Sequence, residues 1–502
     1  MVINGVPDRI RMDGWWLENS VSETPESTGP REKPERCVPT LRYPFAFGAM
    51  VFVVLLADWL FWAHAPGISV AVFSMFLSVA ILSVQRKQTT RLEWGIVLVF
   101  LLVCNLPVIE HLQLLSILFS AIGISALVVW VCYGRVLEWW QAVWVILRVS
   151  TVGAILLPKG ALDDMRDVTI KAGLKHHLKS LALPLGIGGV FLVLLTSANP
   201  LLERFFDQLA RFDFLSVDGI YRVIFWMIAA CLIWPYLNLN ETWVGPVATP
   251  RPRKALQVRW FATLMNVDSV RNSLFLFNGL FLTQTAMDLA VLTGGVSLPE
   301  SMTYAQYAHR GAYPLVATAI LAGVFAIATH KKIEDHRILK MLMFLWLGQN
   351  LFLVIAAAFR LSLYVEVYTL TYLRIAAFIW MGLVFVGISL IVVQIFHSKS
   401  IGWLVRSNLI ALLGTLYLCC FVNFAWLIAE YNLNNARSWY RLDEQYVCAL
   451  GEHALPAIAE HNAETGRRIC VGSGVKTPRH TPIENWRDWG FRDWRLQVYL
   501  AR

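Results

Sequence analysis

Long apolar segments alternate with short polar segments from about residue 44 to residue 429. A helix needs about 20 apolar residues to cross the ~30 Å hydrocarbon core of a bilayer. Backbone groups in lipid must pair within their own segment, so the segments must be helical. The pattern predicts an all-α, polytopic transmembrane bundle of about eleven spans, at 44–64, 67–84, 95–113, 114–133, 180–198, 219–238, 272–292, 312–330, 341–360, 374–396 and 406–429.

The short loops predict the orientation of the bundle. Lys and Arg gather before the first span and after spans two, six, eight and ten, whereas the opposite loops contain fewer of them. Because cytoplasmic loops are enriched in Lys and Arg, the N-terminus is predicted to be cytoplasmic. Residues 1–43 are polar and are predicted to be a disordered cytoplasmic tail. An odd number of spans then places residues 430–502 outside the cytoplasm, as a small C-terminal domain.

One further segment is long enough to cross but carries a charge near its middle. Residues 137–157 are largely apolar, yet Arg148 would lie near the bilayer centre, at a cost of about 3 kcal/mol. A crossing would also invert every later loop. We therefore expect 137–179 to be a cytoplasmic hairpin at the membrane surface, with Trp139, Trp140 and Trp144 at headgroup depth. A full crossing is the alternative.

Composition excludes two large classes of protein. Hydrophobic residues make up 57% of the chain and charged residues only 15%, which excludes a soluble protein of 502 residues. The net charge of +9 could indicate nucleic-acid binding, but the basic residues lie in loops between apolar spans. The charge therefore indicates membrane orientation, and we expect the lipid bilayer as a partner and no nucleic acid.

The C-terminal segment has two features of its own. Aromatic residues alternate with arginines between Trp486 and Arg495, which suits either a partner or membrane surface, or a domain that closes its own core or docks on the bundle. Cys448 and Cys470 are the two cysteines beyond the last span, and an oxidising compartment would let them form a disulfide. The sequence has no Cys/His spacing typical of a metal site, so none is predicted.

Ionisable residues in or beside spans indicate where function could reside, because they are costly in lipid. Gln284 and Asp288 are four residues apart and share a helix face, and Arg360 and Arg374 are candidate partners for the carboxylate. If the stretch between the two arginines is helical, Glu366 lies on the side of Arg374. The predicted topology places all of them near the outer leaflet. The candidate ligand-binding residues are Gln284, Asp288, Tyr304, Tyr307, Arg310, Arg360, Glu366 and Arg374.

These residues support two interpretations. One is an outward-facing polar pocket for an anionic headgroup or solute, in which Asp288 orients Arg360 while Arg374 and Arg310 contact the ligand. The other is a structural ion-pair network, with arginines and tyrosines extending to the interface. The sequence contains no catalytic, phosphate-binding or dinucleotide-binding motif, so catalytic residues and cofactors are not predicted.

Three stretches together resemble a known family. The motifs at 278–288, 298–315 and 360–374 resemble an uncharacterised family of bacterial multi-pass membrane proteins, which is catalogued as a domain of unknown function. The resemblance covers about residues 180–430. Asn199 stands where the family more often has Asp. Thr369 stands where the family usually has Gly, which argues against a tight turn at that position. The resemblance implies a bacterial inner-membrane location and no particular activity.

Three functional hypotheses follow. The first is a protein that binds or transports an anionic or amphiphilic envelope component through the outward-facing pocket. The second is a membrane-embedded transferase that acts on a lipid-linked substrate. The third is a membrane sensor or assembly scaffold, which would use the C-terminal domain and the interfacial hairpin to contact partners. Substitution of Asp288 would discriminate the first two hypotheses from the third.

Overall fold

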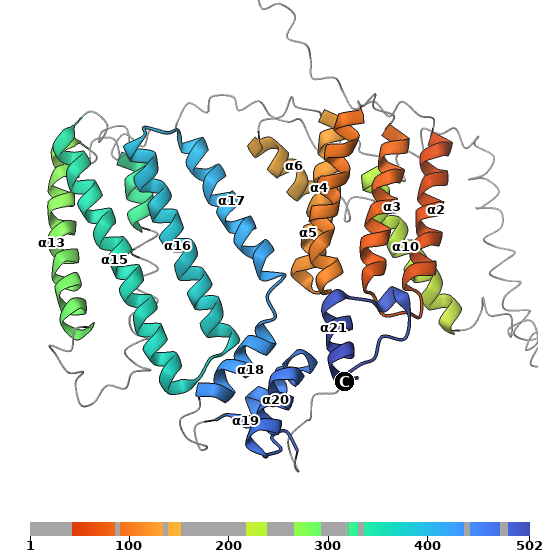
Figure 1. Cartoon of the computed structure of the whole chain (residues 1–502). Helices are drawn as coiled ribbons and strands as arrows, with labels where there is room; N and C mark the ends of the chain where they lie inside the picture. The colour runs from red at the N-terminus through yellow and green to blue at the C-terminus, as the bar shows by residue number, and fades with distance from the viewer. Residues whose placement is uncertain are drawn as a thin grey trace, which may run out of the picture.

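A computed structural model describes residues 43–85, 91–133, 139–151, 217–237, 266–292, 318, 321–329, 336–435, 442–471 and 480–501. These residues form helices joined by short turns, and no strand occurs among them. The helices fall into two bundles with a smaller helical domain at one end (Figure 1). The all-α class expected from the apolar segments is confirmed for this part of the chain.

The first bundle is built from the N-terminal part of the chain. Its core contains fully buried Val53, Ile81 and Leu237, which come from three different helices. Apolar side chains cover most of the surface of these helices, and many point outward, as expected for helices that face lipid. The members are α2 (Tyr43–Phe61), α3 (Ile68–Gln85), α4 (Arg91–Glu110), α5 (Leu114–Tyr133), α6 (Trp139–Thr151) and α10 (Val217–Leu237).

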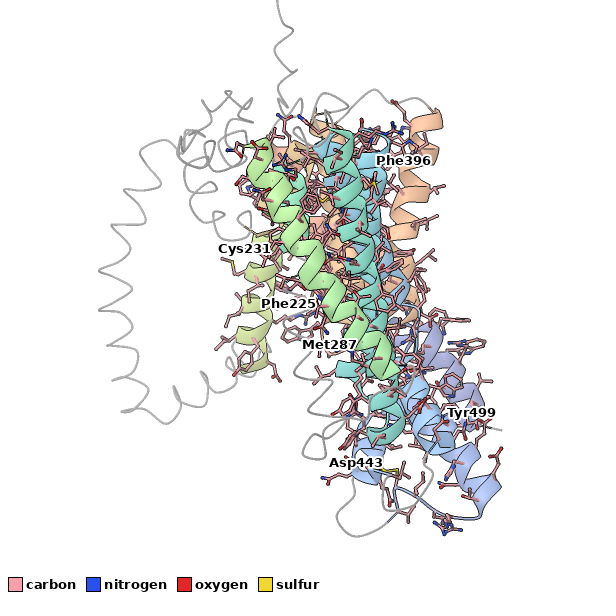
Figure 2. All side chains as sticks on the ribbon, turned by 90° about the vertical axis from the view of Figure 1, so that its left-hand side faces the viewer. Phe225, Cys231, Met287, Phe396, Asp443 and Tyr499 are labelled. Carbon is pink, nitrogen blue, oxygen red and sulfur yellow. A yellow bond between two sulfur atoms is a disulfide. The ribbon has the colours of Figure 1, made fainter. Side chains whose placement is uncertain are left out.

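The second bundle follows further along the chain. Leu274, Met343 and Leu347 are buried at its centre, and Trp346 packs against a group of phenylalanines. Figure 2 shows apolar side chains along the whole length of these helices, including outward-facing Met287. The members are α13 (Val267–Leu292), the helical residues 321–329, α15 (Arg337–Tyr368), α16 (Tyr372–Phe396) and α17 (Ile401–Cys419).

The C-terminal domain lies beneath both bundles in Figure 1. Its core joins Ile428 and Ala454 to Val365 and Leu370, so the domain packs on the junction between α15 and α16. We call the end of the bundles that carries this domain the domain end. Its elements are α18 (Phe424–Asn435), α19 (Glu444–Ala449), η3 (Glu452–Ala454), α20 (Leu455–Thr465), η4 (Trp486–Asp488) and α21 (Phe491–Leu500).

Six of the described helices are long and apolar enough to cross a membrane, namely α4, α5, α10, α15, α16 and α17. Helices α2 and α3 are apolar, but their apolar stretches are shorter than those of the six, and α13 carries more polar residues. These helices make the chain a membrane protein.

The expected spans at 180–198 and most of 312–330, the tail 1–42 and most of the hairpin 137–179 lie outside the described residues. Of the hairpin, α6 buries Val145 in the first bundle and exposes Trp144.

Two predicted boundaries differ from the structure. The span expected at 341–360 is part of a single helix of 32 residues, so Arg360 lies two turns before the helix ends at Tyr368. The span expected at 406–429 is two helices, because α17 ends at Cys419 and α18 begins at Phe424. The Asn423 side chain accepts a hydrogen bond from the backbone N–H of Trp426 at 3.1 Å and so caps the second helix.

Candidate functional site

The centre of the candidate site is an ion pair between α13 and α15. Arg360 Nη2 lies 2.5 Å from Asp288 Oδ2, and the two side chains are 7% and 3% exposed. Gln284 Nε2 donates a hydrogen bond to Asp288 Oδ1 at 3.0 Å, since residues four apart share one helix face. The sequence placed these three residues together as candidates, and the structure brings them into direct contact.

The exposed surface of α13 beside this pair is largely apolar. Leu280 and Met287 are exposed on α13, and with exposed Gln284 they form one stripe beside buried Asp288. Charged groups at such a position must pair, because the surrounding lipid tails and side chains cannot solvate them. The site is therefore an ion pair flanked by an apolar surface, with one polar side chain on the outward stripe.

Polar contacts continue along the same helix interface away from the domain end. Asn278 Nδ2 donates to the carbonyl oxygens of Leu274 and Leu342 at 2.8 and 3.0 Å, and Gln349 Nε2 donates to the carbonyl of Asn278 at 3.4 Å. Because residue numbers increase in the same direction on both helices, α13 and α15 run parallel.

Arg374 stabilises a turn and does not contact Asp288. Its Nη1 donates to the carbonyl of Tyr368 at 2.5 Å and to the carbonyl of Thr369, and its guanidinium stacks over Tyr364 at 4.4 Å. A cation at this position also opposes the negative end of the α15 dipole. Because α15 ends at Tyr368, the helical spacing that would have put Glu366 beside Arg374 does not extend that far.

Of the remaining candidate residues, one is exposed and three lie outside the described residues. Glu366 is exposed on α15. Tyr304, Tyr307 and Arg310, together with the motif at 298–315, lie outside the described residues. The structure therefore brings together Gln284, Asp288 and Arg360, and it separates Arg374 from them.

The first bundle contains a second ion pair between helices, with a largely exposed arginine, that the sequence did not reveal. Asp58 Oδ1 accepts hydrogen bonds from Arg222 Nε at 2.8 Å and from Trp226 Nε1 at 2.9 Å. Its second oxygen contacts Arg222 Nη2. In the sequence, the signal for this pair is an arginine, Arg222, inside an apolar segment. Its partner could not be identified because Asp58 lies 164 residues away in the chain.

The C-terminal domain docks on the first bundle through the segment rich in aromatic residues and arginine. Arg492 Nε donates to Glu110 Oε1 at 3.2 Å, and Arg492 Nη2 donates to the carbonyl of Cys420 at 2.9 Å. The backbone N–H of Ile68 donates to the carbonyl of Trp489 at 2.8 Å. The terminal segment therefore joins α3 and α4 to the end of α17.

A pair of histidines and a carboxylate lie in the same interface. Burial, followed by repulsion from His111, lowers the pKa of His453. Burial alone would raise the pKa of Asp493, but His111, His453 and Arg492 together outweigh it, and the net pKa is lowered. At neutral pH a neutral His453 therefore faces a charged Asp493.

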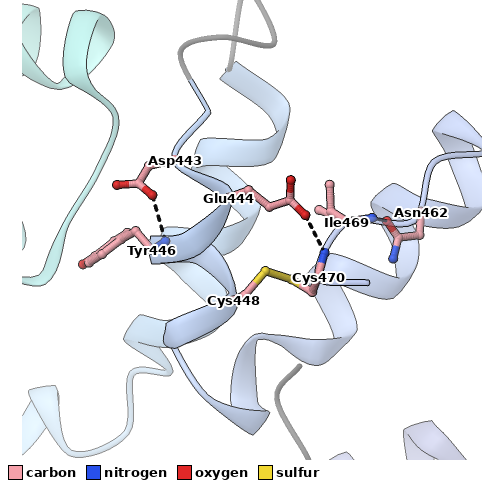
Figure 3. Close-up of a disulfide and its surroundings, with 7 residues drawn as sticks. All are labelled: Asp443, Glu444, Tyr446, Cys448, Asn462, Ile469 and Cys470. Atoms are coloured by element: carbon pink, nitrogen blue, oxygen red, sulfur yellow. Dashed lines mark hydrogen bonds between the residues drawn. A yellow bond between two sulfur atoms is a disulfide. The ribbon is translucent and has the colours of Figure 1, made fainter. Parts of the chain in front are cut away.

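A disulfide joins Cys448 to Cys470 across the domain, with 22 residues of sequence separation and Cα atoms 5.6 Å apart (Figure 3). The Cys470 backbone N–H donates to Glu444 Oε1 at 2.8 Å. Asp443 caps α19 by accepting from the N–H of Tyr446 at 2.9 Å. The disulfide thus connects the last turn of α19 to the segment after α20.

Comparison with known proteins identifies a family but no activity. No curated protein and no solved structure matches the chain. A family model described as "Domain of unknown function (DUF4153)" matches residues 95–461, which extends beyond both ends of the range of the motif resemblance. The match includes the Asp288–Arg360 pair, the turn at Thr369 and the whole second bundle. The chain therefore belongs to the DUF4153 family, a family of unknown function.

Proposed function

We propose that this membrane protein binds an anionic, amphiphilic component of the cell envelope beside α13 and α15, either as a receptor or as the first step of transport. The observation that carries the proposal is the buried Asp288–Arg360 pair, bordered by exposed Gln284 and an apolar helix surface. A headgroup would contact the polar residues while its acyl chains lie along the apolar stripe.

The energetics of the pair favour a functional role. Desolvating two charges costs several kcal/mol per ion, and apolar residues of similar volume often stabilise a protein core equally well. Packing alone therefore does not require an arginine and an aspartate at this interface. Ionisable residues that are retained within apolar helix bundles more often serve a ligand, ion or proton.

The proposed binding step is an exchange of anions on Arg360. A guanidinium pairs with phosphate and carboxylate in the same two-bond geometry, so a headgroup can replace the Asp288 carboxylate. In the ligand-free protein Asp288 is the counter-ion that keeps Arg360 paired. Gln284 lies on the outward stripe and would contact the headgroup as it enters.

The orientation we propose places this site toward the outer leaflet of a bacterial inner membrane. The Cys448–Cys470 disulfide favours an oxidising compartment for the C-terminal domain. Arg337, Lys340 and Arg406 lie toward the opposite end of the second bundle, as the positive-inside rule favours for a cytoplasmic face. Asp288 and Arg360 lie toward the domain end, and hence toward the outer side.

The test is mass spectrometry of lipids and small molecules that co-purify with the full-length protein. We expect one anionic species to be enriched in the wild type and to fall by about tenfold or more in Arg360→Gln, because a charge-assisted pair is lost. In Asp288→Asn the same species is retained or increased, because the competing carboxylate is gone. The matched control is Arg271→Gln on α13, whose exposed pair with Asp268 lies at the opposite end.

Folding is checked by gel filtration, with the double variant Asp288→Asn/Arg360→Gln as the neutral reference. A folded Arg360→Gln that still carries the species at the wild-type level would overturn the proposal. Loss of the species in folded Asp288→Asn would overturn the exchange step, because it would show that Asp288 assists the bound ligand.

A further inference from the structure

Three potential metal ligands meet where the C-terminal domain docks on the first bundle. His111 directly follows α4, His453 lies in η3 and Asp493 lies in the first turn of α21. His111 Nδ1 is 3.4 Å from Asp493 Oδ1, and His453 Nε2 is 3.3 Å from the same oxygen. The two imidazole rings are edge to face, with centroids 4.6 Å apart.

These contacts are long for hydrogen bonds to a charged carboxylate, which are typically about 2.7–2.9 Å. In addition, His111 Nδ1, the ring nitrogen that faces Asp493, is buried and has no well-formed hydrogen bond within the described structure. The arrangement therefore leaves two imidazole nitrogens and a carboxylate oxygen facing one another at distances longer than those of strong hydrogen bonds.

The spacing suits a shared cation. Two zinc–ligand bonds of about 2.0–2.1 Å at a tetrahedral angle place their donor atoms about 3.3 Å apart. The two measured distances to Asp493 match this value, and all three donor atoms lie within 4.8 Å of one another. We propose that His111, His453 and Asp493 bind a divalent transition-metal ion, with zinc as the best match.

The donor set selects the metal class. Imidazole nitrogen suits zinc and its neighbours, whereas Mg²⁺ and Ca²⁺ prefer sites built from oxygen ligands. Three protein ligands leave the fourth tetrahedral position for water or a substrate atom, which is the arrangement of zinc sites that act on a ligand. The side chains of His111, His453 and Asp493 are 24%, 14% and 25% exposed, so water can reach the ion.

The surroundings hold the ligands in place without adding a large excess of positive charge. Arg492 precedes Asp493, but its guanidinium pairs with Glu110, which also lies 3.6 Å from Arg495 Nη2. Asp493 Oδ2 occupies the space that a Cβ atom on Gly490 would need, at 2.5 Å, so the glycine lets the carboxylate pack against the backbone.

The metal would connect three elements that are distant in the sequence. His111 and His453 are separated by 342 positions and His453 and Asp493 by 40, which explains why no ligand spacing is visible in the chain. Bound metal would tie the terminal helix to both α4 and the disulfide-containing part of the domain. This site is separate from Arg360, and its test is independent of the proposed anion exchange.

The experiment uses the full-length protein, purified in detergent through a tag without histidine and stripped with EDTA. Calorimetric titration with Zn²⁺ is expected to show one site per chain. Asp493→Asn and His453→Gln should each weaken zinc binding by about 100-fold or more, since even residues that merely support ligands change affinity by about 10–100-fold. The control is His397→Gln, an exposed histidine at the opposite end of the bundles.

Thermal unfolding separates loss of the site from loss of the fold. Zinc should raise the Tm of the wild type and of His397→Gln, because an ion that binds only the folded state stabilises it. Zinc should leave the Tm of Asp493→Asn and His111→Gln unchanged, while their metal-free unfolding remains cooperative. Absence of a zinc site in the wild type, or equal zinc stabilisation of Asp493→Asn, would overturn the proposal.

Discussion

Thr369 provides a stability prediction that depends on one backbone angle. It follows the last residue of α15 with φ +69° and ψ 176°, a region that is essentially restricted to glycine. Asn432 holds the adjacent residue, because its side chain accepts from the N–H of Leu370 at 2.6 Å and donates to the Leu370 carbonyl at 2.9 Å. Arg374 donates to the carbonyls of Tyr368 and Thr369. These contacts impose the turn on a residue that disfavours it.

The expected change in the free energy of unfolding follows from two opposing contributions. A non-glycine residue in this region costs about 1–3 kcal/mol, which Thr369→Gly would remove. Glycine adds about 0.5–1 kcal/mol of unfolded-state entropy, so the net stabilisation is about 1 kcal/mol. The control is Thr371→Gly, where φ is −137° and any residue is accommodated, so only the entropic loss remains.

The assay is denaturant unfolding of the purified protein in detergent, followed by tryptophan fluorescence. We expect a higher midpoint for Thr369→Gly and a lower midpoint for Thr371→Gly, with unchanged slopes. If both variants lose stability to the same extent, the positive φ at Thr369 is not a property of the folded protein and the reasoning fails.

Two further predictions concern the C-terminal domain. Replacing Cys448 by Ser opens a cross-link over 22 residues and should destabilise the domain by about 3 kcal/mol. The expected result is faster proteolysis within residues 442–501. The control Cys231→Ser, which removes a free cysteine, should leave the rate of proteolysis unchanged. Arg492→Met removes two charge-assisted hydrogen bonds and should lower the stability of the docked helix by about 2–3 kcal/mol. The expected result is faster hydrogen exchange in α21. Unchanged exchange in α21 would contradict the docking contact.

The apolar helices were predictable because hydrophobic length is a local property of the sequence. The ends of the helices were harder to predict from the sequence. Helix α15 continues to Tyr368 although Ser362 and Glu366 lower its hydropathy, because its backbone hydrogen bonds continue past the apolar stretch. The break before α18 lies within residues that read as one apolar span, and the capping asparagine Asn423 was the local signal for it.

Within the candidate site, the sequence indicated contacts only where helix spacing or complementary charge gave a reason. Gln284 and Asp288 share a face by spacing, and Arg360 was a candidate because a buried carboxylate needs a cation. Pairings such as Asp58 with Arg222 depend on which helices become neighbours, and hydropathy does not determine this. The role of Arg374 required knowing where α15 ends.

The measurement that tests the central claim most directly is an electron cryo-microscopy map of the protein in nanodiscs made with lipids of its own membrane. The proposal predicts headgroup density bonded to Arg360, with Asp288 displaced from the guanidinium and acyl density along the stripe of Leu280 and Met287. An intact Asp288–Arg360 pair at full occupancy, with only acyl-chain density on α13, would show that the pair is structural and would contradict the claim.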